Sequence, residues 1–277
     1  MAEDLAGTRA GPFLRWAGGK SWLVPYLNEM IPEPGIGNYH EPFLGGGAIF
    51  FDVRPKGTAY LSDLNSELMD TYKAVRDRVE QVIYELGLFK NTKECYYKVR
   101  SQSPRSAAAR AARFIFLNQT SFNGIYRVNL KGEYNVPYGH RKKEFLQAES
   151  LRAASETLAG TDLFQGDFDE VRKSVSAGDF VFLDPPYTVS HNNNGFVKYN
   201  QKLFCHSDQL RLRDLVEHLE RVGAWYVLTN AAHVSIAEIF DGVTGRRVEL
   251  SRISRVGGKE APRGRFSEYL FTNLDLP

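Results

Sequence analysis

Short apolar runs of strand length alternate along the chain with segments of helical periodicity. An apolar run of about four to eight residues bounded by turn residues is typical of a buried strand, whereas apolar residues three or four positions apart indicate a helix. Seven runs predict strands, at Tyr39–Phe43, Thr58–Ser62, Thr161–Gln165, Asp179–Leu183, Ala224–Leu228, Arg246–Leu250 and Glu268–Thr272. Residues 208–222 predict a helix with Ser207 as its N-cap. The alternation predicts an α/β fold, a doubly wound seven-stranded sheet with helices on both faces.

The alternation stops between residues 66 and 157. Three helical patterns follow one another there, over Ser66–Phe89, Thr92–Ser101 and Ser106–Asn118, and a segment rich in Gly and Asn comes after them. In that segment Tyr126, Val128 and Leu130 alternate with polar residues ahead of a Lys-Gly pair, which predicts a β-hairpin. We therefore divide the chain into a core, residues 11–65 and 158–277, and a helical, hairpin-bearing insertion, residues 66–157.

The composition is that of a folded protein of 277 residues, with 43% hydrophobic and 25% charged residues. Two cysteines, Cys95 and Cys205, are too few for a disulfide framework or a zinc site, so we expect reduced thiols and no metal. The first dozen residues lack the apolar core of a signal peptide, and we expect a cytoplasmic protein. No run approaches the ~18 apolar residues of a membrane-spanning helix, so we expect no membrane partner.

Positive charge is concentrated in the middle of the chain. Residues 91–143 contain eleven Lys and Arg against Glu94 and Glu133, which gives this segment a charge of +9. Because the whole chain carries +2, the remainder carries −7. Such asymmetry is typical of a polyanion-binding segment attached to a neutral or acidic body.

The apolar run Phe180–Leu183 leads into Asp184-Pro185-Pro186-Tyr187. The two prolines fix their own φ, favour extended backbone before them and have no N–H, so the carbonyl groups are held stiffly. The carboxylate of Asp184 and the carbonyl of Pro185 are two acceptors for an amine with two hydrogens, and Tyr187 has a flat face for a planar ring. The motif predicts a clamp for the exocyclic amine of a nucleobase. The alternative is a simple strand-to-turn corner, which Asp-Pro often forms.

Glycines follow the first predicted strand, in Glu41-Pro42-Phe43-Leu44-Gly45-Gly46-Gly47. Glycines between a strand and a helix let a ligand approach the backbone beside the helix N-terminus. The dinucleotide fingerprint is absent because position 50 is Phe, and a tight turn is the alternative. Asp63 ends the second predicted strand, where an acid accepts hydrogen bonds from ribose hydroxyls. Asp63 or Asn65 could equally cap the following helix.

Two further motifs combine aromatic and charged side chains. In Phe13–Lys20, Trp16 could cover a planar or cationic group and Lys20 could pair with a carboxylate, while the spacing excludes a Walker loop. After the third predicted strand, Asp167 and Phe168 could bind an adenine ring by hydrogen bonding and stacking. A buried Trp beside a turn and an ordinary turn are the respective alternatives.

The predicted hairpin, residues 122–139, carries side chains suited to reading bases. Arg binds guanine through two hydrogen bonds, Asn binds adenine in the major groove, and aromatic side chains can wedge between base steps. The candidate DNA-binding residues in and beside the hairpin are Asn123, Arg127, Asn129, Lys131, Asn135, Tyr138 and Arg141. A solvated surface hairpin is the alternative for this segment taken alone.

Five segments in order, Phe13–Lys20, Glu41–Phe50, Ser62–Asn65, Phe122–Gly139 and Asp184–Tyr187, resemble the Dam-type DNA adenine methyltransferases. Within that family the chain is similar to the enzymes of GATC modification systems, and the resemblance covers residues 12 to 273. It implies a Rossmann-like methyltransferase core in the alpha arrangement, with the glycine loop first, then the recognition insertion, then the Asp-Pro-Pro-Tyr motif. The chain departs from the family in the Asn-rich segment 188–198, which bears on the recognition sequence rather than on the reaction.

The resemblance also implies roles for individual residues. S-adenosylmethionine is the implied cofactor, contacted by Trp16, Lys20, Glu41, Phe43, Gly45, Asp63, Asp167, Phe168 and Asp184. Asp184, Pro185 and Tyr187 are implied as the catalytic clamp around an adenine flipped out of double-stranded DNA, with Arg127 reading a base. The resemblance implies a monomer or weak dimer and leaves open whether a companion restriction enzyme exists.

Other functions compete with this interpretation. A methyltransferase of the same fold could act on a cytosine amine, an RNA adenine or a protein glutamine, but Asp at position 184 and the basic insertion favour DNA adenine. A non-catalytic DNA-binding protein could keep the fold, but the intact Asp184–Tyr187 motif and Lys20 argue against it. A nicotinamide dehydrogenase is least favoured, because the third glycine of its fingerprint is missing.

Overall fold

The computed structural model of the chain describes residues 10–32, 35–129, 131–187, 204–243, 245–253 and 265–275. The Asn-rich segment 188–198 lies outside these residues. All seven predicted strands are present, with ends shifted by up to three residues. They are β1 (Tyr39–Glu41), β2 (Ala59–Asp63), β3 (Asp162–Gln165), β4 (Phe180–Leu183), β5 (Trp225–Ala231), β6 (Arg246–Ile253) and β7 (Arg265–Thr272).

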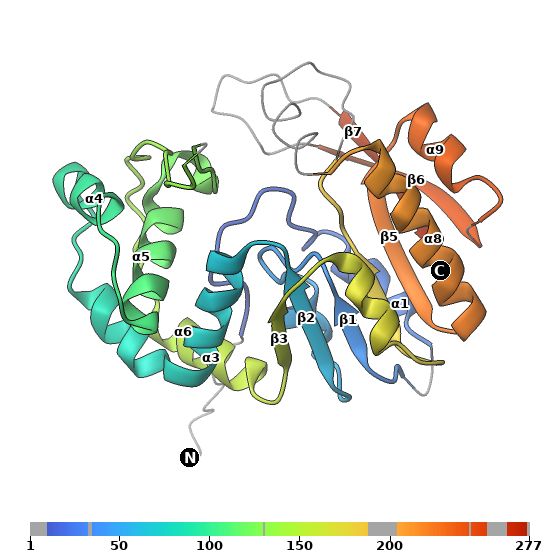
Figure 1. Cartoon of the computed structure of the whole chain (residues 1–277), viewed down its shortest axis with the longest axis horizontal. Coiled ribbons are helices and arrows are strands. Elements are labelled where there is room, and N and C mark those ends of the chain that lie inside the picture. Colours follow the sequence, from blue (N-terminus) through green and yellow to red (C-terminus); the bar gives the residue numbers. More distant parts are fainter. Residues whose placement is uncertain are drawn as a thin grey trace, which may run out of the picture. The chain divides into compact units, whose positions relative to one another are not determined.

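The strands form one sheet in the order β3-β2-β1-β4-β5-β7-β6 (Figure 1). β4 pairs in parallel with β1 and β5, whereas β7 is antiparallel to both β5 and β6. The carboxyl ends of parallel strands meet at one edge of a sheet, so the residues that follow β4 and those at the end of β5 lie at the same edge. The mixed seven-stranded sheet confirms the predicted α/β, Rossmann-like fold.

The chain separates into two compact units. The first unit comprises Met1–Pro25, Leu44–Arg54 and Leu61–Gly166, and the second comprises Tyr26–Phe43, Pro55–Tyr60 and Asp167–Pro277. The predicted insertion, residues 66–157, lies within the first unit, and its independence as a domain stays a prediction. Helix α1 (Val24–Met30) spans the first boundary between the units in sequence.

Four helices dominate the first unit: α3 (Ser66–Gly87), α4 (Lys93–Arg100), α5 (Ala107–Thr120) and α6 (Ala148–Leu158), with the short α2 (Phe50–Val53) beside them in sequence. α3 packs against α5 and α6, and α4 packs against α5 (Figure 1). Each predicted start carries a cap, because the side chains of Asn65, Thr92 and Ser106 accept hydrogen bonds from backbone N–H groups one turn ahead.

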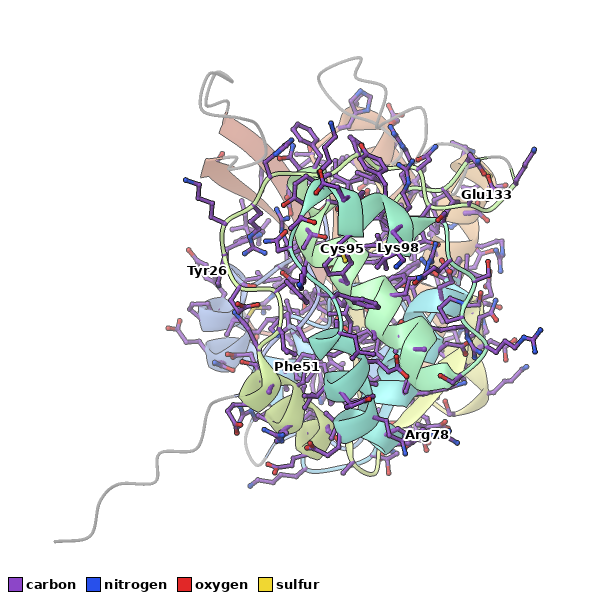
Figure 2. All side chains as sticks on the ribbon, turned by 90° about the vertical axis from the view of Figure 1, so that its left-hand side faces the viewer. Tyr26, Phe51, Arg78, Cys95, Lys98 and Glu133 are labelled. Atoms are coloured by element: carbon purple, nitrogen blue, oxygen red, sulfur yellow. The ribbon has the colours of Figure 1, made fainter. Side chains whose placement is uncertain are left out.

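The predicted hairpin exists as two isolated antiparallel bridges, Ser121↔Tyr138 and Val128↔Tyr134, instead of continuous strands. The short helix η1 (Phe122–Gly124) opens it, with Asn123 at φ 55°. At its far end the side chain of Asn129 accepts hydrogen bonds from the backbone N–H groups of Lys131 and Glu133. A side chain that binds local backbone competes with ladder pairing, which explains the shortened strands. Lys98 on α4 and Glu133 of this hairpin are both exposed (Figure 2).

In the second unit α8 (His206–Val222) packs against β5 (Figure 1). Leu212, Leu215 and Leu219 of this helix are buried, as are all four residues of β4. The remaining helices here are η2 (Phe168–Lys173) and α9 (Val234–Phe240). The predicted cap Ser207 is wrong: the N-cap is Cys205, whose backbone N–H donates to Asp208 Oδ2 at 2.9 Å. Within the described residues, no helix is long and apolar enough to cross a bilayer.

Candidate active site

Asp184 stands directly after the buried strand β4, and its carboxylate is held from the neighbouring strand. β4 and β5 are in parallel register with Leu183 opposite Leu228, so the next residue of β5, Thr229, lies beside Asp184. The hydroxyl of Thr229 donates to Asp184 Oδ1 at 2.7 Å. Pro185 is buried and Asp184 is only partly exposed. The buried strand and the hydrogen bond from Thr229 therefore fix the direction in which the Asp184 carboxylate points.

Tyr187 is fixed from a third strand. Its hydroxyl donates to Glu268 Oε2 at 2.9 Å, and Glu268 stands on β7, where only 3% of the residue is exposed. Burial, followed by the negative charges of Asp184 and Glu268, raises the pKa of the Tyr187 phenol well above its ordinary value. The phenol is therefore neutral at physiological pH and acts as a hydrogen-bond donor.

The glycine loop of the first unit is ordered by Asp63. Its carboxylate accepts hydrogen bonds from the backbone N–H of Gly45 at 3.1 Å and of Asn65 at 3.0 Å. Burial raises the pKa of Asp63, and the backbone hydrogen bonds from Asn65, Gly45 and Leu64 oppose that rise. The hydroxyl of Tyr72 donates to the carbonyl of Gly45 at 3.1 Å. Asn65, rather than Asp63, caps α3.

Gly45 must be glycine for two reasons. Its φ of +48° is left-handed, and a Cβ built there would come within 2.6 Å of the Trp16 indole. Trp16 in turn stacks on Tyr126, with ring centroids 5.8 Å apart and planes 21° from parallel. Lys20 is only 3% exposed, and its ammonium donates to the carbonyl of Gly18 at 2.9 Å. The structure thus brings Trp16, Gly45 and Asp63 together within the first unit.

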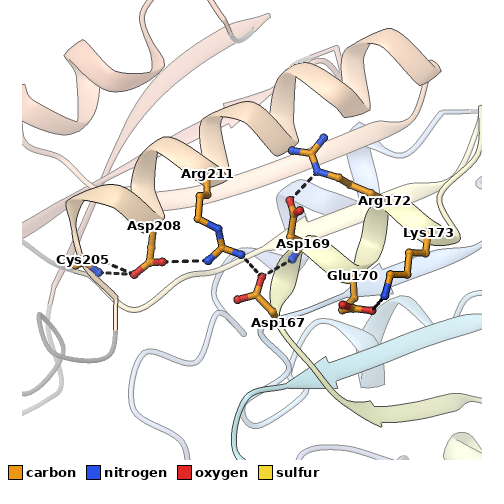
Figure 3. Close-up of polar contacts among 8 residues, drawn as sticks. All are labelled: Asp167, Asp169, Glu170, Arg172, Lys173, Cys205, Asp208 and Arg211. Carbon is orange, nitrogen blue, oxygen red and sulfur yellow. Dashed lines mark hydrogen bonds and ion pairs between the residues drawn. The ribbon is translucent and has the colours of Figure 1, made fainter.

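The candidate adenine-binding residues Asp167 and Phe168 already have neighbours in the second unit. Arg211 on α8 donates to Asp167 Oδ1 at 2.6 Å (Figure 3). Its guanidinium also lies over the Phe168 ring, 4.8 Å from the ring centroid. Phe43 stacks on the same ring at 5.4 Å, and Phe168 is only 2% exposed. Glu41 is also buried and accepts a hydrogen bond from the Tyr39 hydroxyl at 2.7 Å. The Asp167 carboxylate therefore has a cationic partner.

In the hairpin, Arg127 and Asn135 lie side by side. Arg127 is exposed, and its Nε donates to Asn135 Oδ1 at 2.8 Å. Lys131 and the exposed Asn123 lie in turns of the same segment. Tyr138 and Arg141 face inward instead, since the Tyr138 hydroxyl donates to Asn91 Oδ1 and Arg141 donates to Gln119 Oε1. The predicted DNA-binding residues thus divide into an exposed group and a group bonded to the helical part.

Residues 16–253 match the model of one protein family, described as D12 class N6 adenine-specific DNA methyltransferase. The chain belongs to this family. The resemblance to Dam-type enzymes is therefore confirmed, and the protein is an adenine-specific DNA methyltransferase whose substrate is DNA.

Relatives of this D12-class methyltransferase match along most of their length. The chain is 35% identical to "Type II methyltransferase M1.LlaDCHI" of Lactococcus lactis subsp. cremoris, over 95% of each chain. It is 35% identical to "Type II methyltransferase M.MjaIII" of Methanocaldococcus jannaschii, over 91% of this chain and 96% of the relative. It is 29% identical to a "DNA adenine methylase" of Vibrio cholerae, over 93% and 94% respectively.

Reasoning from the sequence did not find Thr229 and Glu268, the two residues that bond the side chains of Asp184 and Tyr187 in this D12-class methyltransferase. Their signal was present but weak. Thr229 and Asn230 are two polar residues in β5, next to the apolar residues of that strand. Asn230 donates to Gln209 Oε1 at 2.9 Å within the core. Glu268 is a single acid at the start of a predicted strand. A buried polar residue in a strand has a bonding partner, but the sequence does not show which one.

A basic hollow of about 740 Å³ lies in the first unit of the methyltransferase. It is lined by residues 86–91 and 138–146, among them Lys90, Arg141, Lys142 and Lys143. Lys142 and Lys143 are exposed. Among the residues that the structure describes, no three His, Cys, Asp or Glu side chains are grouped to hold a metal ion.

Proposed function

We propose that this methyltransferase transfers a methyl group from S-adenosylmethionine to the 6-amino group of an adenine flipped out of duplex DNA. One observation carries the proposal. Asp184 and Tyr187 follow the buried strand β4, and each is bonded by a side chain from another strand of the same sheet, Thr229 on β5 and Glu268 on β7. A site held in this way is pre-organised for a planar base with an amino group.

The clamp acts by hydrogen bonding to the amine. The base must leave the duplex to reach it, because its amino group is paired inside the stack. The Asp184 carboxylate and the Pro185 carbonyl accept the two amino hydrogens, and Tyr187 stacks on the ring. Two acceptors on one amine draw its lone pair out of conjugation with the ring, which makes the nitrogen a better nucleophile. This role requires position and charge and no covalent enzyme intermediate.

The donors and acceptors of the chain suit S-adenosylmethionine, which supplies an electrophilic methyl group when bound. Lys20 is a buried ammonium suited to the carboxylate of the cofactor, and Trp16 provides an aromatic face. The Asp63 carboxylate suits its polar groups, as does Asp184 at the clamp, and Gly45 lets the ligand approach the loop closely. Asp167 and Phe168 suit the adenine ring, with Arg211 already against both of them. The buried Glu41 and the partly buried Phe43 complete this set of cofactor contacts in the second unit.

GATC is the recognition site that we propose, with Arg127 reading a guanine. Arg127 is exposed in the hairpin and is oriented by Asn135, and a guanidinium matches the two acceptors of guanine. Asn123, Asn129 and Lys131 complete this group of candidate DNA-binding residues. Tyr138 and Arg141 support the hairpin through their hydrogen bonds to the helical part of the unit. The same proposal includes a cytoplasmic location and a monomer or weak dimer. It also includes a companion restriction enzyme, in line with relatives named Type II methyltransferases.

The test is methyl transfer to defined DNA. Purified protein is incubated with tritiated S-adenosylmethionine and a duplex with one GATC site, and the matched control duplex carries N6-methyladenine at both target positions. We expect label in the first duplex and none in the second. No label in any adenine-containing duplex contradicts the proposal. Label that follows adenine but not GATC contradicts only the site, and mapping of methylated adenines in expressing cells then identifies the true one.

A further inference from the structure

The contact between Tyr187 and Glu268 joins an aromatic residue of the clamp to a buried acid. The donor is in the segment after β4 and the acceptor is on β7, 81 residues later, with 2.9 Å between the oxygens. Glu268 is opposite Ala231 in the antiparallel register of β5 and β7, so its backbone is fixed by the sheet. A bond from a strand to a residue after a strand end transfers the rigidity of the sheet to that residue.

Burial of the Glu268 carboxylate costs free energy that another interaction must compensate. Only 3% of the residue is exposed, and a buried carboxylate loses most of its hydration. An apolar side chain at this strand position would pack without that cost. The phenol of Tyr187 compensates the carboxylate by donating a hydrogen bond to it, with 2.9 Å between the oxygens. Such a bond restricts rotation of the tyrosine about its side-chain bonds.

We propose that Glu268 is a positioning residue for methyl transfer, which fixes the plane of the Tyr187 ring against the flipped adenine through the phenol hydrogen bond. This inference rests on the proposed function, because it assigns Tyr187 to base stacking. Glu268 on β7 bonds Tyr187 as Thr229 on β5 bonds Asp184, so both members of the clamp are held from the sheet.

A double-mutant cycle tests this role. Tyr187→Phe removes the donor and keeps the ring, Glu268→Met removes the acceptor at similar volume, and the double variant combines both changes. Glu268→Gln keeps an acceptor, and Glu249→Gln, an exposed acid on β6, is the matched control. The readouts are the single-turnover methylation rate with tritiated S-adenosylmethionine, the Kd for the GATC duplex and the thermal unfolding midpoint.

We expect Tyr187→Phe and Glu268→Met each to lower the single-turnover rate by about 10- to 100-fold, the scale of one hydrogen bond to a charged group. The Kd for DNA should stay within about twofold, because the bond acts after binding. The double variant should be no slower than the slower single variant, Glu268→Gln should recover most of the rate, and Glu249→Gln should match the wild type.

Additive losses in the double variant overturn the proposal, because Glu268 would then act independently of the phenol. A wild-type rate for Tyr187→Phe also overturns it, and this result does not depend on whether Glu268→Met folds. The wild type separates the two levels of inference. If it methylates no adenine, the proposed function fails; if it does and the cycle is additive, only the role of Glu268 fails.

Discussion

The clamp in the second unit and the glycine loop in the first are held by different means. Asp184 and Tyr187 are anchored by side chains 45 and 81 residues away in sequence, on separate strands. Gly45 is anchored by Asp63, 18 residues away, through its backbone N–H, and by the packing of Trp16. One part is held by side chain–side chain hydrogen bonds from the sheet and the other by backbone hydrogen bonds and close contact.

The two kinds of anchoring suit different roles. Groups fixed by neighbouring strands hold one geometry, which suits a step that depends on the direction of a lone pair. A glycine loop that is held through its backbone lets a ligand come close to the chain, which suits binding. We therefore expect changes in the clamp to reduce the rate of methyl transfer and changes around the glycine loop to reduce affinity.

The largest expected effect breaks the clamp itself. Asp184→Ala removes its charged acceptor and should lower methyl transfer by about 10²–10³-fold, the typical loss for one transition-state contact. Tritium incorporation into a GATC duplex measures this. Thr229→Val, which removes only the hydroxyl that holds the carboxylate, should cause a smaller loss. A turnover of Asp184→Ala close to that of the wild type would disprove the mechanism.

The second prediction tests whether the glycine loop serves affinity. Asp63→Ala should weaken S-adenosylmethionine binding by roughly 1–3 kcal/mol, the scale of lost charge-assisted hydrogen bonds, in titration calorimetry. Tyr72→Phe is the matched control, since it removes the hydrogen bond from the Tyr72 hydroxyl to the Gly45 carbonyl and leaves Asp63 intact. Equal losses in both variants would mean that Asp63 acts only by ordering the loop. Unchanged affinity in Asp63→Ala would remove it from the cofactor site.

The third prediction concerns base specificity, a property separate from the rate of methyl transfer and from cofactor affinity, and it depends on Arg127. Arg127→Ala should remove about 1–3 kcal/mol of discrimination at one base pair, because a bidentate contact to guanine is lost. Methylation rates on duplexes with every single-base variant of GATC measure this. Asn135→Ala, which removes the partner of the guanidinium, should relax the same base pair less. If Arg127→Ala slows all duplexes by one common factor, Arg127 contacts phosphate instead.

The smallest expected effect concerns salt. Lys142→Ala and Lys143→Ala, at the basic hollow, should each lower the slope of log Kd against log salt by about 0.9 if the residue contacts a phosphate. Lys173→Ala is the control, because Lys173 lies on η2 in the second unit and pairs with Glu170. Slopes equal to that of the wild type in both variants would identify these lysines as solvated surface.

Local sequence determined the elements and the reaction class. Every predicted strand is present, since a buried strand has a local apolar pattern, and the caps Thr92 and Ser106 act within one helical turn. The Asp184–Tyr187 motif was readable because its geometry depends on adjacent prolines. At the start of α8 the preference for a Ser cap gave the wrong residue, because the helix begins two residues earlier, after Cys205.

Only the tertiary structure decided what holds the site. Thr229 and Glu268 reach the clamp because β4, β5 and β7 are neighbours, and strand order is a property of the whole sheet. Likewise Arg211 meets Asp167 because α8 packs near η2, 44 residues later in sequence. A hydrogen bond between distant residues leaves no periodicity in the sequence. For this reason the tetrapeptide Asp184–Tyr187 indicated the reaction class from sequence, whereas the residues that hold it could be identified only in the folded structure.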